Sequence, residues 1–139
     1  MIFIPIYSDS MSFRFDLNKY YENYLIGLVD FQMGALKDPN FIEISCNQID
    51  STVENPKRIL KNIFFNRVNN TSRDKYLSWS NFNIAFYPLD SCINHLELKI
   101  TKQNGTPFIA KEFMANDPKI ILTLALVPIK TKENKWVCI

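Results

Sequence analysis

The chain has 139 residues, of which 47% are hydrophobic and 22% are charged. This length suits one hydrophobic core rather than two, and the apolar content is too high for a disordered chain. We therefore expect a single domain covering residues 1–139. Sixteen basic and fourteen acidic residues are interleaved and leave a net charge of only +2, so the charge gives no strong nucleic-acid signal.

The start of the chain, MIFIPIYSDS, is apolar but has neither a charged n-region nor a small-residue cleavage site, so we expect no signal peptide. The longest apolar run, residues 120–129, is far shorter than the roughly 20 residues that cross a bilayer as a helix, so we expect no membrane span. Three widely spaced cysteines, Cys46, Cys92 and Cys138, fit thiols in a reducing compartment better than a disulfide framework.

The first predicted strand is MSFRFDL, residues 11–17, where apolar and polar residues alternate with the period of a half-buried strand. The next stretch also fits a helix; we predict a turn or short helix over residues 17–23 and then a strand over residues 24–31. A turn at residues 37–40, which contains proline and asparagine, leads to a strand over residues 41–48.

A second turn at residues 54–57 precedes a predicted strand over residues 59–65, and a polar loop follows over residues 66–75. Alternation returns in NFNIAFY, residues 81–87, with one face formed by Phe82, Ile84 and Phe86.

HLELKI, residues 95–100, is the next predicted strand, and Asn104-Gly105 marks a tight turn after it. The closing run IILTLALV, residues 120–127, is apolar on both faces. We expect it to be covered on both sides, by the second sheet and by a neighbouring subunit or the chain's own terminus. Short strands without a helix between them predict an all-β fold: a single antiparallel jelly-roll sandwich of about eight strands.

Catalysis by a Cys–His pair depends on His95, because it is the one histidine of the chain. Cys46 or Cys92 with His95 is the sole dyad available. Cys46 shares its side of the strand with apolar residues, so a small buried hydrophobic residue is the better interpretation, and the polar residues after it mark where the strand meets water. His95 has the opposite parity to Leu96 and Leu98, which predicts a solvent-facing side chain.

Other chemistry has little support. One histidine and three dispersed cysteines give no metal-ligand pair at close spacing, and three glycines are too few for a phosphate-binding loop. The carboxylates are better interpreted as solvated charges at strand edges than as a catalytic pair. We therefore expect no cofactor and no enzymatic activity, with a small cysteine hydrolase, resting on His95, as the enzyme alternative.

Five short motifs follow one another in an order that resembles one known family. They are YYENYLIGLVDF (20–31), CNQIDS (46–51), ILKNIFF (59–65), YPL (87–89) and LKITKQNGTPF (98–108). This order, which covers about two-thirds of the chain, resembles the jelly-roll structural proteins of Polinton-type elements and adintovirus-like viruses. The resemblance implies a virion component, a penton, minor capsid or attachment protein, found in the host-cell cytoplasm or nucleus before assembly.

The aromatic content indicates assembly. Eleven phenylalanines, six tyrosines and two tryptophans exceed what the core of so small a sandwich holds, and exposed apolar patches on identical subunits favour symmetric assemblies. We expect a homo-oligomer, with other capsid proteins and a host-surface receptor as further partners. The candidate interface consists of aromatic residues at predicted strand ends, loops and the tail: Tyr20, Tyr24, Trp79, Phe113 and Trp136.

A trimeric receptor- or carbohydrate-binding module of the TNF/C1q-like type would have the same sandwich. Exposed aromatics such as Tyr20, Tyr21, Tyr24 or Trp79 would then form its binding face. The chain has no basic arm, which favours a shell or surface component over one that packages a genome.

Overall fold

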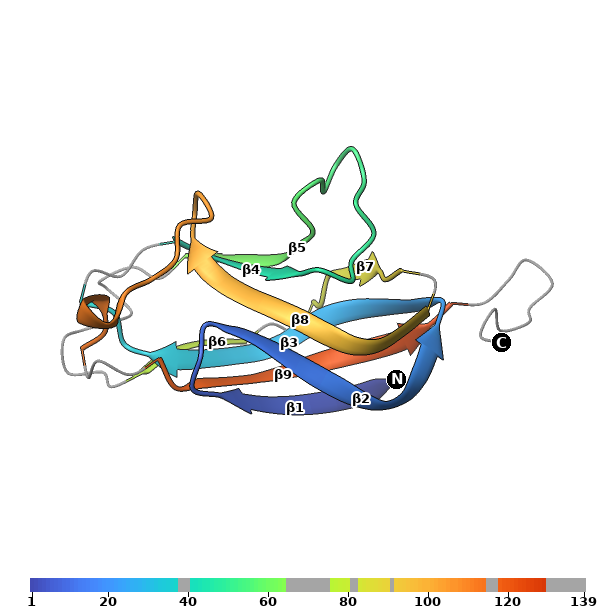
Figure 1. The fold of residues 1–139 in the computed structure, drawn as a ribbon, viewed down its shortest axis with the longest axis horizontal. Helices are drawn as coiled ribbons and strands as arrows, with labels where there is room; N and C mark the ends of the chain where they lie inside the picture. Colours follow the sequence, from blue (N-terminus) through green and yellow to red (C-terminus); the bar gives the residue numbers. More distant parts are fainter. Residues whose placement is uncertain (38–40, 65–75, 81–82, 91, 115–117, 130–139) are drawn as a thin grey trace.

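The computed structural model describes residues 1–37, 41–64, 76–80, 83–90, 92–114 and 118–129. These residues form strands and one short 3-10 helix, Ala110–Glu112. Two sheets are stacked face to face (Figure 1). The strands are β1 (Ile2–Ser8), β2 (Ser12–Glu22), β3 (Tyr24–Gly34), β4 (Phe41–Cys46), β5 (Ile59–Phe64), β6 (Tyr76–Ser80), β7 (Phe86–Pro88), β8 (Cys92–Lys102) and β9 (Ile120–Pro128).

The strand pairs are nested, as in one long hairpin. β1 pairs with β9, β2 with β8, β3 with β6 and β4 with β5, all antiparallel. Rolling this hairpin up places β9 beside β3 and β8 beside β4. The result is sheet A, in the order β1-β9-β3-β6 with β7 as a further partner of β3, and sheet B, in the order β2-β8-β4-β5. This pairing is a jelly roll, so the predicted fold class is confirmed.

The core lies between the inner faces of the two sheets. On β9, Leu122, Leu124 and Leu126 are buried, and Leu124 lies in register with Ile4 of β1 on one side and Leu28 of β3 on the other. On β8, Leu96 and Leu98 are fully buried, so the alternation predicted for residues 95–100 is the pattern that builds the core. The prediction that residues 120–127 are covered on both sides is wrong for Ile121, which is 45% exposed on the outer face.

The turn or short helix predicted over residues 17–23 is wrong, because β2 continues to Glu22. The pairing of β2 with β8 shifts register between Asp16 and Tyr21, and such an irregularity interrupts the two-residue period. The spacing then imitates a helix. Asn23, with a positive φ of 57°, makes the turn by which the chain passes from sheet B to sheet A.

Other bounds also differ. Within the strand predicted over residues 81–87, residues 83–85 are not part of a strand and β7 begins at Phe86. Phe82 lies outside the described residues, as does the predicted loop over residues 66–75. Sequence patterns did not identify β1 or β6. Both are edge strands of sheet A, where pairing on one side only leaves weaker constraints on composition.

Candidate functional site

The buried end of β4 separates Cys46 from water. Cys46 is fully buried, and this burial raises the pKa of its thiol to about 11. The prediction that Cys46 behaves as a small buried hydrophobic residue is confirmed. Cys92 is exposed, and Cys138 lies outside the described residues.

Gln48 lies between Cys46 and His95. Its Oε1 accepts a long contact of 3.7 Å from the Cys46 thiol, and its Nε2 is 3.3 Å from Nε2 of His95. His95 belongs to the outer face of sheet B, as predicted, but it is only partly exposed because neighbouring side chains contact its ring. The imidazole therefore lies against polar groups rather than against the buried thiol.

Polar residues after β4 fasten the β4–β5 connection to β8. The backbone N–H of Asn47 donates to the carbonyl of Glu97 at 3.0 Å, and its side-chain amide donates to Oε2 of Glu97 at 3.1 Å. In return, the backbone N–H of Glu97 donates to Oε1 of Gln48 at 2.7 Å. The Cys46-Asn47-Gln48 stretch is thus a structural junction between two strands.

A pair of carboxyl groups lies at the same junction. Burial, then a hydrogen bond to the Asp50 carboxyl, raises the pKa of Asp90 above its ordinary value, while Arg58 opposes this shift. The Arg58 side chain also donates to the carbonyl of Ile49 at 2.9 Å. Asp90 therefore holds its proton more readily than an ordinary aspartate does.

Metal and membrane sites have no support within the described ranges. No group of three or more His, Cys, Asp or Glu side chains there is arranged to hold a metal ion. The described part of the chain also has no helix long and apolar enough to cross a membrane.

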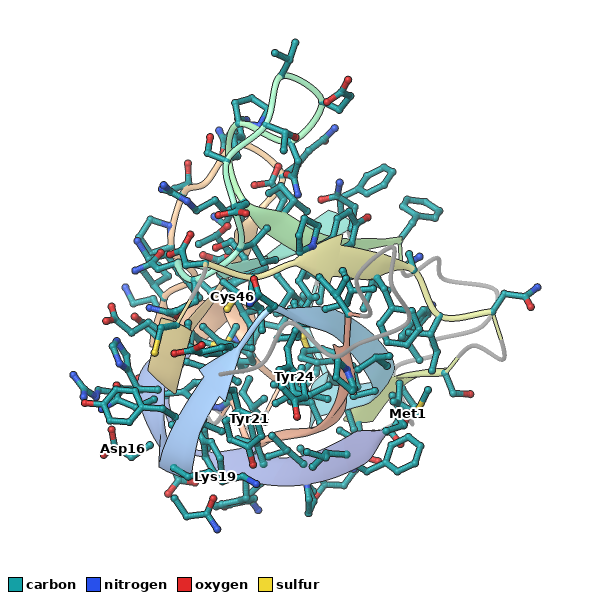
Figure 2. All side chains as sticks on the ribbon, turned by 90° about the vertical axis from the view of Figure 1, so that its right-hand side faces the viewer. Met1, Asp16, Lys19, Tyr21, Tyr24 and Cys46 are labelled. Carbon is teal, nitrogen blue, oxygen red and sulfur yellow. The ribbon has the colours of Figure 1, made fainter. Side chains whose placement is uncertain are left out.

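The aromatic residues predicted to form the interface differ in how exposed they are. Tyr20 on β2 is 67% exposed. Tyr24 is partly buried and packs edge-on against Tyr21, with ring centroids 5.1 Å apart. In the end-on view of Figure 2 these two tyrosines lie between the sheets, whereas Asp16 and Lys19 lie at the periphery.

Trp79 on β6 is also partly buried, and the Lys61 ammonium of β5 lies 5.1 Å from its ring centroid. The expectation of a surface ring is wrong for Phe113, which is 2% exposed because a β-bridge to Leu36 brings it into the core. Trp136 lies outside the described residues.

An apolar strip that the sequence patterns did not predict lies on the outer face of sheet A. Phe3 is 57% exposed, Tyr7 61% and Ile121 45%. Tyr7 lies in register with Ile121, and Phe3 with Ala125, so these side chains share one face of two neighbouring strands. Neither residues 2–8 nor residues 120–128 include a charged side chain. A signal was present, since MIFIPIY is apolar at every position before Ser8, and residues 120–127 are apolar except for Thr123.

The strip ends where a segment before β7 covers the outer face of sheet A. A Cβ on Gly27 of β3 would overlap Ile84 and come within 3.0 Å of the Ala85 carbonyl, so this segment crosses the outer face there. On the other flank of Ile121 is a hollow of about 390 Å³, lined by polar side chains of β3 and β6 together with Phe31, Trp79 and Ile121 itself. The strip is therefore bounded by the chain on one side and by a hollow of mixed polar and apolar lining on the other.

A second exposed apolar surface lies on the outer face of sheet B. Phe41 of β4 and Phe64 of β5 lie in register, with ring centroids 4.8 Å apart. Both are exposed.

No protein-family model matches the chain, and no curated protein matches it in sequence. The family resemblance of the five motifs therefore stands on their order and on the jelly roll alone.

Proposed function

We propose that the protein is a structural component of a virus particle, a single-jelly-roll penton, minor capsid or surface attachment protein that assembles with copies of itself. The order of the five motifs supports this proposal, and so does the nested pairing of the strands. Jelly rolls also occur in lectins and cupins, so the fold alone does not select this function. We propose no enzymatic role.

The observation that carries the proposal is the uncharged strip on β1 and β9. Contiguous exposed apolar surface usually marks an interface. Addition of a strand to the free edge of β1 is disfavoured, because Pro5 has no N–H to donate at the middle of that edge. The strip therefore favours packing of its face against a partner.

A second copy of the chain is the partner that best fits the two apolar surfaces. They lie on opposite sheets, so a two-fold dimer through one of them would leave the other exposed. A head-to-tail contact between the strip and the Phe41–Phe64 surface covers both at once and closes into a ring when the rotation permits. In a particle, neighbouring capsid proteins and a host-surface receptor would then occupy the surfaces that remain.

Mixing two variants tests this arrangement. Phe3→Ser with Tyr7→Ser removes one surface, and Phe41→Ser with Phe64→Ser removes the other. By sedimentation at micromolar concentration we expect wild-type protein to be oligomeric and each variant alone to be monomeric. An equimolar mixture should have twice the mass of one chain. As a control, Val53→Ser changes an apolar residue that is 95% exposed on the β4–β5 connection and should leave the wild-type mass unchanged.

Two results would contradict the proposal. A wild-type protein that stays monomeric has no self-assembly for the strip to explain. A Phe41→Ser, Phe64→Ser variant that still dimerises would show a two-fold contact through the strip instead of a head-to-tail one.

A trimeric binding module of the TNF/C1q-like type remains the second candidate, because Tyr20 places an exposed aromatic ring on sheet B. Aromatic rings are common in binding faces. This alternative predicts a discrete trimer that binds a carbohydrate or receptor, with binding lost in Tyr20→Ser while the trimer persists.

A further inference from the structure

One ring nitrogen, Nε2 of His95, lies close to two side chains with opposite requirements. It is 3.3 Å from Nε2 of Gln48, an amide nitrogen that only donates, and 3.0 Å from Oε1 of Glu97, a carboxylate oxygen that only accepts. An imidazole nitrogen carries either a proton or a lone pair. It therefore satisfies one of these two partners at a time.

The orientation of the Gln48 amide is fixed by other contacts. Its Oε1 accepts from the backbone N–H of Glu97 at 2.7 Å and from the thiol of Cys46 at 3.7 Å. Turning the amide over would place NH₂ against both donors, so Nε2 must face His95. The other ring nitrogen, Nδ1, is 3.0 Å from Oδ1 of Asn94, an acceptor. A proton on Nδ1 therefore suits both charge states of the ring.

Charged groups face His95 from the neighbouring strand β2 and from its own strand β8. On β2, Asp16 lies opposite His95 in register, and its carboxylate is paired with Arg14 at 2.8 Å. On β8, Glu97 is followed on the same face by Lys99. The β4–β5 connection places the amides of Asn47 and Gln48 against Glu97 and His95, and its charged residues Asp50 and Arg58 lie beside Asp90. Glu97 is thus the charged group in direct contact with the ring.

We propose that the protonation state of His95 controls a hydrogen bond between β8 and the start of the β4–β5 connection, residues 47–58. The neutral ring accepts from Gln48 and ties the connection to β8. The protonated ring donates to Glu97 instead, so one hydrogen bond moves from between the connection and β8 to within β8. Acidification therefore loosens the root of a connection that projects from the sandwich (Figure 1).

A second proton-dependent contact at this root acts in the opposite direction. The pKa of Asp90 is raised in the folded protein by burial and by its hydrogen bond to Asp50, so protonation of Asp90 favours the folded state. Overall stability therefore mixes two effects of opposite sign. A test has to follow the contact between His95 and Gln48 itself.

Nuclear magnetic resonance can follow both partners in the intact protein. The ring signal of His95 needs no assignment among histidines, because the chain has one. Between about pH 8 and about pH 5, we expect the side-chain NH₂ signals of Gln48 to shift with the same midpoint as the His95 ring. In His95→Gln these signals should stay constant. In the control Lys99→Gln, which removes a charge from the same face, the Gln48 signals and the His95 ring should still shift with one common midpoint.

Gln48 signals that stay fixed while the ring titrates would overturn the proposal. The same holds for Gln48 signals that keep shifting in His95→Gln. The comparison of midpoints in the wild-type protein is decisive on its own if that variant does not fold.

Discussion

Leu124→Ala tests whether β9 is the strand that holds sheet A together. Leu124 is fully buried, with Ile4 and Leu28 in register on its two sides. The substitution removes three carbon atoms, which at about 0.8 kcal/mol each amounts to about 2.4 kcal/mol of lost transfer free energy. The cavity left between paired strands adds to this loss. We expect the free energy of unfolding to fall by about 2–5 kcal/mol, measured by urea denaturation.

The matched control is Ile121→Ala on the same strand. Its side chain points outward and is exposed, so in the monomer the loss should stay near or below about 1 kcal/mol. A Leu124→Ala loss under about 0.5 kcal/mol would refute the reasoning, because it would mean that β9 is not packed between β1 and β3.

Three further predictions follow from buried contacts. Cys46 should react with a neutral thiol reagent at pH 7 only after unfolding, because burial and a pKa of about 11 suppress its thiolate. The labelling rate in folded His95→Ala should equal that of the wild-type protein. Fast labelling that this substitution abolishes would instead indicate a Cys–His pair. Gly27→Ala should lower the free energy of unfolding by about 1–3 kcal/mol, because the added Cβ overlaps Ile84 in the segment that covers it. An unchanged denaturation midpoint would show that this segment moves away without a cost in stability. The pKa of Asp90 is raised in the folded state. As the pH rises and Asp90 loses its proton, the free energy of unfolding therefore falls. Asp90→Asn should therefore gain stability relative to wild type at pH 7, with a smaller gain near pH 4, and a gain that grows on acidification would reverse the sign we assign.

Local pattern accounts for the strands but not for how they meet. Alternation predicted the strand over residues 11–17 and failed beyond it, where the register shifts, because an irregular pairing changes the period without a change in composition. Phe113 was misplaced because its burial depends on a bridge to Leu36, far away in the sequence. Periodicity carries no information about such a partner.

The candidate sites show the same division. The polar exit of β4 was visible in the sequence, and the burial of Cys46 followed from its parity. The contact between Gln48 and His95 joins residues of two strands brought together by the pairing of β4 with β8. Only the register of that pair decides which side chains meet, and register is set by the whole sheet.

Nested pairing also has a consequence for how the chain is made. The outermost pair joins Ile2 to Leu126, so its closure must wait until residue 126 has been synthesised, and contacts so distant in sequence make folding slow. β9 lies between β1 and β3 in sheet A, yet it leaves the ribosome after all the other described strands. Until then both neighbours expose an unpaired edge, and nascent chains are open to mispairing with one another.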